Sequence, residues 1–343
     1  MSVPIPAEMR ALELPQYHDD LATAVRGLRV VRKPVPRPRH GQVLVRMAAA
    51  PCNPSDTLLL QGRSGVHKPL PTVPGWEGAG TVVASGGGWL ANWLRGKRVA
   101  CGGQIDADGT WAEYYVCHAT HCAPLRRDLN LEQAACLLVN PLTALALVGL
   151  ARRGRHRAAV QTAAASQLGR MIIRLARHVG LPLVSSVRRP SQIDELKALG
   201  AEHVLNSESP EFDDQLRRLA TKLGATIAFD AIAGPMPARL LRAMPDGSTV
   251  FVYGALSLRD CCDLNPIDLL FRGQRLEGFF LGTWIERQGL LRQLHLIRRA
   301  QSLAVSGVLS TTILHRLPYD EVPARLMNCL QTGQPGKVLI VPA

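Results

Sequence analysis

QTAAASQLGRMIIRLA, residues Gln161 to Ala176, decides the fold, because it places a turn of small residues between an apolar strand and an amphipathic helix. The turn, Ala164 to Gly169, occupies the place of the dinucleotide fingerprint G-x-G-x-x-G, with Ala164 and Ser166 at the first two glycine positions. Only Gly169 is kept, so the motif alone is weak. The context strengthens it, because small residues let a pyrophosphate approach the free N–H groups at a helix start. The alternative is a tight strand-to-helix turn that binds nothing.

Strands and helices alternate around this turn. Apolar runs predict strands at 158–163, 182–187, 203–205, 226–231, 249–253 and 276–281. Helical patterns lie between them in "QLGRMIIRLARHVG" and "PSQIDELKALGA", and a further helix is predicted at 289–300. This alternation predicts an α/β fold with a doubly wound parallel sheet, which binds ligands at the carboxyl ends of its strands.

The first third of the chain has a different pattern. Residues 1 to about 125 contain short β-rich runs bounded by Gly and Pro, such as "GQVLVRMAAAPC" and "GAGTVVASG". The last segment, "GKVLIVPA", is also β-rich, and we expect it to return to this first domain. The apolar stretch 134–151 approaches membrane-spanning length, but Asn140-Pro141 interrupts it, so we interpret it as a buried helix with a break near its start.

Composition sets the broad class. A chain of 343 residues with 47% apolar and 20% charged residues fits two globular domains. The net charge of +13 invites a nucleic-acid hypothesis, yet the arginines are dispersed and no aromatic run separates them. We favour an arginine-rich solvated surface, with attraction of an anionic cofactor or substrate as an alternative. Nucleic acid and membrane are not expected partners.

The cysteines indicate the compartment. The eight cysteines form no C-x-x-C pair, which argues against a structural zinc site. Scattered cysteines with apolar neighbours suit a reducing compartment, and no secretory signal is visible at the start. We expect a cytoplasmic protein.

The end of the second predicted strand indicates which nucleotide binds. An NAD site usually has Asp or Glu there, whereas "LVSSVRRP" offers Ser185, Ser186, Arg188 and Arg189. Arginine pairs with a 2′-phosphate that a carboxylate would repel. The sequence therefore favours NADPH, with two surface arginines at a strand end as the alternative.

The chain resembles the medium-chain dehydrogenase/reductase superfamily, in its zinc-independent branch of quinone oxidoreductases and enoyl-thioester reductases. The resemblance rests on nine motifs in order along the chain: NPSDTLLLQG, PGWEGAGTVV, GTWAEYYV, LLVNPLTAL, AAASQLG, LGAEHVLN, VYGALS, LEGFFLGTW and GKVLIVP. It implies a GroES-like β domain at 1–127 and 308–343 around a Rossmann NADP-binding domain at 128–307. It also implies a homodimer, paired through the strand in "LEGFFLG".

Zinc enzymes of the superfamily hold a catalytic zinc with Cys, His and Cys. Those positions match Asn53, Trp76 and Val139 here, and neither Trp nor Val can bind zinc. We therefore expect no metal. Trp76 is interpreted as filling the vacated pocket, and the neighbouring Glu77 as an acceptor of hydrogen bonds.

The resemblance implies a set of cofactor contacts. The implied cofactor-binding residues are Asn53, Thr143, Ala165, Ser166, Gln167, Leu168, Gly169, Ser186, Arg188, Arg189, Ala231, Tyr253, Gly254, Ala255, Phe279, Leu281 and Lys337. Three of them have structural alternatives. Asn53 can form an Asx turn before Pro54, Thr143 can cap a helix, and Tyr253 can pack at a strand end.

The proton donor departs from the family pattern. Enoyl-thioester reductases carry a Tyr just after the Q-G pair, where this chain has Ser64, a much poorer acid. Tyr17 and His67 are possible substitutes, or water protonates the product. An ordinary surface-loop role is the alternative for both. The candidate catalytic residues are thus Asn53, Ser64 and Tyr17.

Without a Lewis acid, the feasible reaction is hydride transfer to an activated C=C bond or a quinone, where the substrate's own carbonyl takes up the negative charge. We expect an NADPH-dependent reductase of α,β-unsaturated carbonyls or quinones. An enoyl-thioester reductase is the alternative enzyme. An NADPH-binding structural or RNA-binding protein is the alternative from another class.

Overall fold

The computed structural model describes residues 4–332 and 334–342, and the chain forms two compact units. Unit 1 comprises Met1–Val139 with Ile297–Ala343, and unit 2 comprises Asn140–Leu296. The predicted second domain, 128–307, extends beyond unit 2 at both ends. One reason is that helix α4 (Leu131–Ala135) packs on the strands of unit 1.

Unit 2 is built on a six-stranded parallel sheet, which confirms the predicted α/β class. Its strands are β8 (Ala158–Gln161), β9 (Leu183–Val187), β10 (His203–Asn206), β11 (Ala225–Asp230), β12 (Thr249–Val252) and β13 (Arg275–Gly278). Their order is β10-β9-β8-β11-β12-β13, and every neighbouring pair is parallel. The order reverses at β8, so the turn after β8 lies at the topological switch point where such sheets bind ligands.

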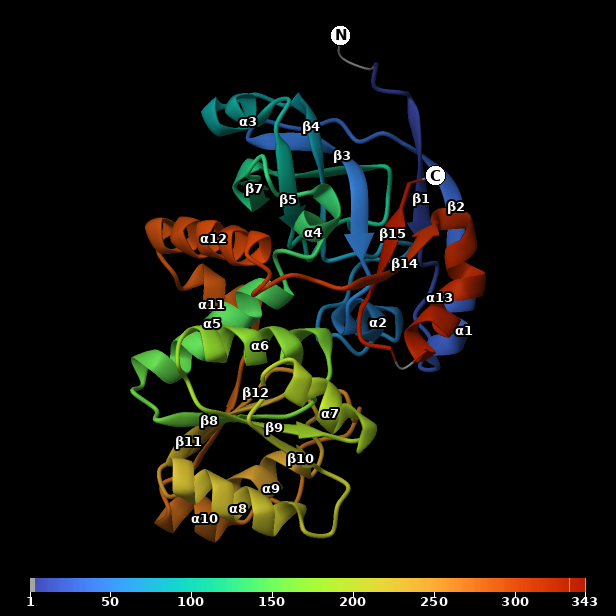
Figure 1. Cartoon of the computed structure of the whole chain (residues 1–343). Coiled ribbons are helices and arrows are strands. Elements are labelled where there is room, and N and C mark those ends of the chain that lie inside the picture. The colour runs from blue at the N-terminus through green and yellow to red at the C-terminus, as the bar shows by residue number, and fades with distance from the viewer. Residues whose placement is uncertain (1–3, 333, 343) are drawn as a thin grey trace. The chain divides into compact units, whose positions relative to one another are not determined.

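Helices cover both faces of this sheet, with α5 and α6 on one side and α8 and α9 on the other (Figure 1). The helices are α5 (Asn140–Arg153), α6 (Gln167–His178), α7 (Ser191–Ala198), α8 (Phe212–Leu223), α9 (Met236–Ala243), α10 (Pro266–Phe271), α11 (Leu281–Glu286) and α12 (Leu290–Val305), the last of which crosses the division between the units. Strand side chains such as Val160 and Val250 pack with Leu216 and Leu240 in a fully buried core.

The strand predicted at 276–281 is shorter in the structure. β13 ends at Gly278, opposite Val252, the last residue of its partner β12. One further bond joins the Phe279 N–H to the Val252 carbonyl, and helix α11 then begins at Leu281. The prediction was wrong beyond Phe279 because strand length depends on a partner strand that a local pattern does not reveal.

Unit 1 is mainly β, as predicted. Its elements are β1 (Glu8–Glu13), α1 (Leu21–Arg26), β2 (Arg29–Pro34), β3 (Gln42–Pro51), α2 (Pro54–Leu60), β4 (Glu77–Ser85), α3 (Trp89–Leu94), β5 (Arg98–Gly102), β6 (Tyr114–His118), η1 (Ala119–His121), β7 (Cys122–Pro124), α4, β14 (Ile313–Pro318), η2 (Tyr319–Glu321), α13 (Val322–Gln331) and β15 (Lys337–Val341). The main sheet has the order β14-β15-β3-β4-β5-β7, with β6 paired to β3.

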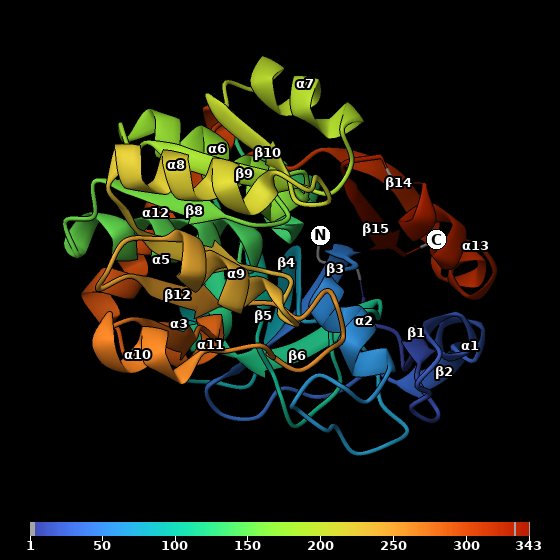
Figure 2. The same ribbon diagram turned by 90° about the horizontal axis from the view of Figure 1, so that it is seen from below.

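The C-terminal strand returns to the first unit, as expected, because Leu339 and Ile340 of β15 pair with Pro51 and Ala50 of β3. A separate antiparallel pair, β1 and β2, lies beside α1, and α1 packs against α13 (Figure 2). This return carries Lys337, the first residue of β15, to the end of β3, where the candidate site begins.

The apolar stretch 134–151 is a broken, buried helical segment, as predicted. α4 ends at Ala135, and α5 begins at Asn140 with Pro141 in its first turn. Within the described residues, no helix combines the length and the apolar composition needed to cross a bilayer.

Candidate active site

A buried polar cluster of Asn53, Asp56, Glu77 and Lys337 lies in unit 1 where β3 ends and α2 begins. The sequence Asn-Pro-Ser-Asp starts α2, with Pro54 at its first position and Asp56 at its third. The Asp56 carboxylate accepts a hydrogen bond from the Asn53 N–H at 2.7 Å, as in a capping box. Its other oxygen accepts from the Trp76 N–H at 3.1 Å, which ties α2 to the residue before β4.

Asn53 is held from two sides. Its Nδ2 donates to Glu77 Oε1 at 3.0 Å, and its Oδ1 accepts from Lys337 Nζ, which also donates to the Cys52 carbonyl at 3.3 Å. The side chain therefore has partners on β4 and β15, in addition to its place at the start of α2. One N–H of the Asn53 amide is left for another acceptor.

Glu77 accepts hydrogen bonds, as predicted. Besides the bond from Asn53, its Oε2 accepts from the backbone N–H groups of Leu138 and Val139 at 2.8 and 3.0 Å. Burial raises the pKa of the Glu77 carboxyl, and the hydrogen bond from Asn53 opposes that rise. Glu77 thus fixes the Asn53 amide and the last residues of unit 1 before unit 2 begins.

Asp56 should make the stability of the protein depend on pH. Burial raises the pKa of its carboxyl to about 7, against an ordinary value of 3.8. A raised folded-state pKa gives stability that is complete below the unfolded-state pKa and is lost as pH rises through the folded-state pKa. Between about pH 4 and pH 7 the wild type should therefore lose up to about 4 kcal/mol of unfolding free energy relative to Asp56→Asn.

Urea unfolding of both proteins at a series of pH values measures this difference. The surface variant Asp214→Asn, which removes an exposed carboxylate in an ion pair with Arg217, is the control and should track the wild type. Parallel stability curves for wild type and Asp56→Asn would refute the assignment.

Trp76 lies next to this cluster with a cation over its ring. Lys68 Nζ is 4.8 Å from the Trp76 ring centroid and donates to the Ala107 carbonyl at 2.7 Å. Burial lowers the pKa of Lys68, while Asp56 and two nearby aspartates oppose the change. The Trp76 Nε1 is buried with no partner among the described residues. Trp76 therefore contributes apolar bulk and a ring face at this point.

The predicted cofactor turn of unit 2 has a form that suits a pyrophosphate. Ser166 caps α6, and its Oγ accepts from the Gly169 N–H at 3.1 Å. The first turn of a helix presents backbone N–H groups toward its start, where a phosphate can accept hydrogen bonds from them. A Cβ on Gly169 would lie 2.6 Å from the Cα of Ala164, so only glycine allows this close approach of helix and turn.

The end of β9 carries the groups that we expect at a 2′-phosphate. The Ser186 hydroxyl is buried with no partner among the described residues, and Arg188 is exposed at the end of the strand. No salt bridge joins Arg188 to an acidic residue in the described parts of the chain. An unpaired buried hydroxyl and an exposed guanidinium fit a phosphate on a ribose.

Comparisons with known proteins agree with this geometry. Residues 39–127 match the family described as the alcohol dehydrogenase GroES-like domain, and residues 168–295 match that described as zinc-binding dehydrogenase. The human mitochondrial enoyl-[acyl-carrier-protein] reductase is 30% identical over 87% of this chain and 81% of its own length. The corresponding enzyme of Arabidopsis thaliana is 28% identical over 91% and 84%. The chain belongs to the medium-chain dehydrogenase/reductase superfamily.

Solved structures show the same fold. The structure of a putative NADPH:quinone reductase from Mesorhizobium loti has a TM-score of 0.92 and 36% identity, covering 99% of this chain and all of that one. One from Bacillus thuringiensis, at 23% identity and a TM-score of 0.86, supports the fold alone. The protein is therefore an oxidoreductase of the medium-chain dehydrogenase/reductase superfamily.

The three residues that the sequence resemblance matched to zinc ligands are Asn53, Trp76 and Val139. Asn53 is bonded to Glu77 and Lys337, and the side chains of Trp76 and Val139 offer no metal ligand. Within residues 4–332 and 334–342, no group of three or more His, Cys, Asp or Glu side chains is placed to hold a metal ion.

The candidate proton donors Tyr17 and Ser64 lie in one loop region of unit 1, but their hydroxyls are engaged. The Tyr17 hydroxyl donates to the Lys68 carbonyl at 2.7 Å and accepts from the Lys68 N–H at 2.8 Å. The Ser64 hydroxyl donates to the Val66 carbonyl at 2.6 Å. The exposed His67 ring packs edge-on against Tyr17. Each hydroxyl would have to leave its backbone partner to protonate a substrate, so their catalytic role stays a prediction.

The other predicted cofactor residues are placed as follows. Thr143 lies inside α5, three residues after its start, so it does not cap that helix. Tyr253, Gly254 and Ala255 follow β12, and the Tyr253 hydroxyl is buried with no partner among the described residues. Phe279 follows β13 directly, and Leu281 is the first residue of α11. Their contact with a cofactor, like that of Arg189 and of Ala165, stays a prediction.

Sequence reasoning missed a buried pair at the carboxyl ends of β8 and β11. The Thr162 hydroxyl donates to Asp230 at 2.7 Å, and Asp230 accepts from the backbone N–H of Ala233 at 2.7 Å. The Thr162 oxygen in turn accepts from the N–H of Ala231, a predicted cofactor residue. An aspartate that ends an apolar strand was the available indication. The pair fixes the backbone that follows β11.

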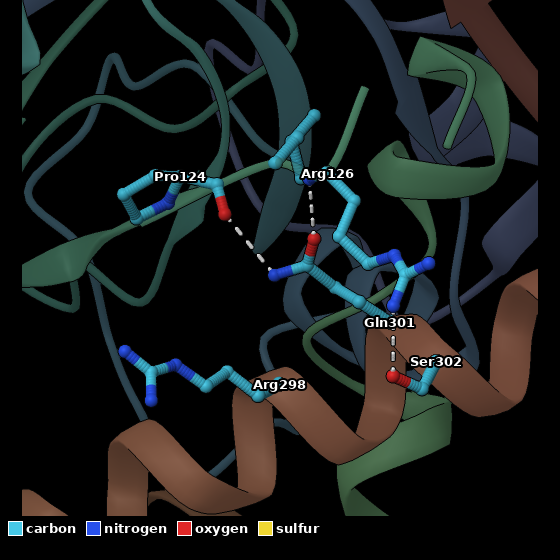
Figure 3. Close-up of a pocket in the computed structure, with 6 residues that line it drawn as sticks. Pro124, Arg126, Arg298, Gln301 and Ser302 are labelled. Carbon is cyan, nitrogen blue, oxygen red and sulfur yellow. Dashed lines mark hydrogen bonds between the residues drawn. The ribbon is translucent and has the colours of Figure 1, made fainter. Parts of the chain in front are cut away.

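A pocket of about 450 Å³ lies in unit 1, and none of the residues that line it belongs to the polar cluster. Figure 3 shows Arg126 and Arg298 at this pocket, with Gln301 bonded to the Arg126 N–H and to the Pro124 carbonyl. Arg126 is paired with Asp128, whereas Arg298 has no ion pair within the part of the chain that the structure describes. One guanidinium does not define a ligand, and we assign no function to this pocket.

Proposed function

We propose that this protein reduces α,β-unsaturated carbonyls or quinones with NADPH, without zinc. The observation that carries the proposal is the bonding of Asn53, whose amide is held by Glu77 and Lys337 at a place where zinc enzymes have a metal ligand. A clamped amide offers a hydrogen-bond donor but no Lewis acid. Substrates whose own carbonyl takes up the negative charge suit such a site.

The residues of the chain would bind and orient the reactants. NADPH, when bound, supplies the hydride. The first turn of α6 and Ser166 would hold the pyrophosphate, and Ser186 with Arg188 the 2′-phosphate. The remaining N–H of Asn53 would donate a hydrogen bond to a carbonyl or amide oxygen, with its position fixed by Glu77.

Relatives support both substrate classes of the proposal, the quinones and the activated C=C bonds. The Mesorhizobium loti protein, 36% identical over nearly the whole chain, is described as a putative NADPH:quinone reductase. The human relative is described as a reductase of enoyl groups on acyl carrier protein, which are activated C=C bonds. An enoyl-thioester reductase therefore remains the alternative enzyme, although Ser64 and Tyr17 are both bonded to backbone groups.

Turnover of a free enone, a quinone and an enoyl-CoA, measured side by side with NADPH, tests the proposal. We expect the enone or the quinone to have the highest kcat/KM, and activity to survive dialysis against a chelator. Strong preference for the thioester would favour the alternative enzyme, and loss of activity with the chelator would refute the zinc-free reaction.

Arg188 should determine the choice between NADPH and NADH. Charge-assisted bonds to a phosphate contribute about 1.5–3 kcal/mol, so Arg188→Ala should weaken NADPH binding roughly 10- to 100-fold and leave NADH binding unchanged. Fluorescence titration of both nucleotides measures this gap. Arg218→Ala, which removes another exposed arginine of unit 2, is the control. Equal affinities for the two nucleotides in the wild type would refute the cofactor assignment.

The remaining expectations concern assembly and location. We propose a homodimer joined at β13, because β13 is an edge strand and nearby α10 exposes Leu270 and Phe271 at 73% and 79%. Light scattering tests it, and a monomer would refute it.

We further propose a cytoplasmic location. A structural or RNA-binding protein would be favoured instead by salt-sensitive RNA binding together with no NADPH oxidation on any enone or quinone.

A further inference from the structure

Sulfur atoms gather in one small core of unit 1, apart from the polar cluster. The Sγ atoms of Cys117 and Cys122 are 3.4 Å apart, and Cys101 Sγ lies 3.9 Å from the sulfur of Met47. All four side chains belong to the core that packs α3 against the sheet. The register of β5 and β7 places Cys101 directly opposite Cys122.

The closest pair is set by the local fold. Cys117 is near the end of β6, Cys122 is the first residue of β7, and the three-residue turn η1 lies between these strands. β6 pairs with β3, and β7 pairs with β5, so both thiols are carried into the same core by strands of one sheet. A disulfide bond is about 2.05 Å long, so the two sulfur atoms must approach each other by roughly 1.4 Å to form one.

We propose that Cys117 and Cys122 are a site of reversible oxidation, which forms an intrachain disulfide when the protein meets a small peroxide. All eight cysteines are free thiols in the structure. A metal is a poorer occupant of the same thiols, because no cluster in the described residues meets the geometry of a metal site. The activity proposed above neither requires this disulfide nor produces it.

The two thiols differ in ways that assign their order of reaction. Cys122 is 9% exposed and Cys117 is fully buried, so a small oxidant reaches Cys122 first. The hydrogen bond with Cys122, followed by burial, raises the pKa of the Cys117 thiol well above its usual range. Cys117 therefore stays a neutral thiol beside Cys122 until that residue has been oxidised.

The reaction is balanced. The Cys122 sulfur attacks one peroxide oxygen, so that an S–O bond forms and the O–O bond breaks, and the departing oxygen takes the proton of the Cys122 thiol and leaves as an alcohol or water. The Cys117 sulfur then attacks the sulfur of Cys122, so that the S–S bond forms and the S–O bond breaks. The hydroxide leaves with the Cys117 proton as water. The two thiols lose two electrons, and the peroxide gains them.

The test uses the full-length protein with Cys261→Ser and Cys262→Ser, because those adjacent, more accessible thiols would otherwise react with the oxidant as well. The folded protein is treated with hydrogen peroxide, alkylated and digested with chymotrypsin. Cleavage after Tyr115 and Leu125 gives the peptide 116–125, which holds Cys117 and Cys122 and excludes Cys101. We expect this peptide to carry no alkyl group and to be lighter than its reduced form by two hydrogen atoms. Dithiothreitol should restore the reduced form.

Two variants make the result specific. Cys101→Ser leaves the pair intact and should still form the disulfide. Cys117→Ala, with folding checked by circular dichroism, should not form it, and its Cys122 should proceed to sulfinic acid instead. A disulfide between Cys122 and Cys101, or an alkylated 116–125 peptide from oxidised folded protein, would overturn the proposal.

Discussion

Glu77→Ala should lower kcat by about two orders of magnitude while NADPH affinity changes little. The Glu77 carboxylate accepts the hydrogen bond that holds the Asn53 amide and two more from Leu138 and Val139. Hydrogen bonds to a charged group contribute about 1.5–3 kcal/mol each, and three are lost together. Without them, Asn53 can rotate away from the substrate, and Lys337 loses the nearby buried charge.

The same variant should lose about 3–5 kcal/mol of unfolding free energy, because one partner of a buried charged network is removed. Stability and kcat must therefore be measured together. Glu77→Gln keeps one oxygen that can accept from Asn53, but it loses the second oxygen that accepts from the backbone N–H groups of Leu138 and Val139. Its kcat should therefore lie between that of the wild type and that of Glu77→Ala. Glu132→Ala removes a more exposed carboxylate paired with Arg316 and should change neither quantity by much. Wild-type kcat in folded Glu77→Ala would refute the positioning role.

The sequence predicted the parts of the fold that depend on local pattern. Alternating strands and helices, and the small-residue turn after β8, were enough for the parallel sheet and its switch point. The length of β13 was not predictable in this way, because β13 stops opposite the last residue of β12, about 26 residues earlier in the chain.

The candidate site also combines features that local sequence predicts with features that depend on distant residues. Glu77 was predicted as a hydrogen-bond acceptor because Trp76 and Val139, at the matched zinc-ligand positions, leave it no metal to serve. The engagement of Tyr17 depends on a bond to Lys68, 51 residues away, which no local pattern contains. Asp56 carries a readable pattern, the Asn-x-x-Asp capping box, yet its burial beside Glu77 follows from long-range packing. The chemistry of single residues was predictable, and their partners were not.

Gly169→Ala should weaken NADPH binding by at least about 30-fold, which corresponds to roughly 2 kcal/mol. The added Cβ would lie 2.6 Å from the Cα and the carbonyl oxygen of Ala164, and backbone cannot rotate out of its way. Helix α6 must then move from the turn, and the N–H groups of its first turn move with it. Isothermal titration with NADPH, together with thermal unfolding, measures both consequences.

Gly149→Ala in α5 is the matched control, because its new Cβ would meet only the flexible end of Arg153 at 3.2 Å. Alanine is favoured over glycine inside a helix by about 1 kcal/mol, so this variant should be as stable as the wild type or more so. The same methyl group thus has opposite expected effects at two helical positions of unit 2. If Gly169→Ala bound NADPH as well as Gly149→Ala does, pyrophosphate binding would not depend on the close approach of α6 to the turn after β8.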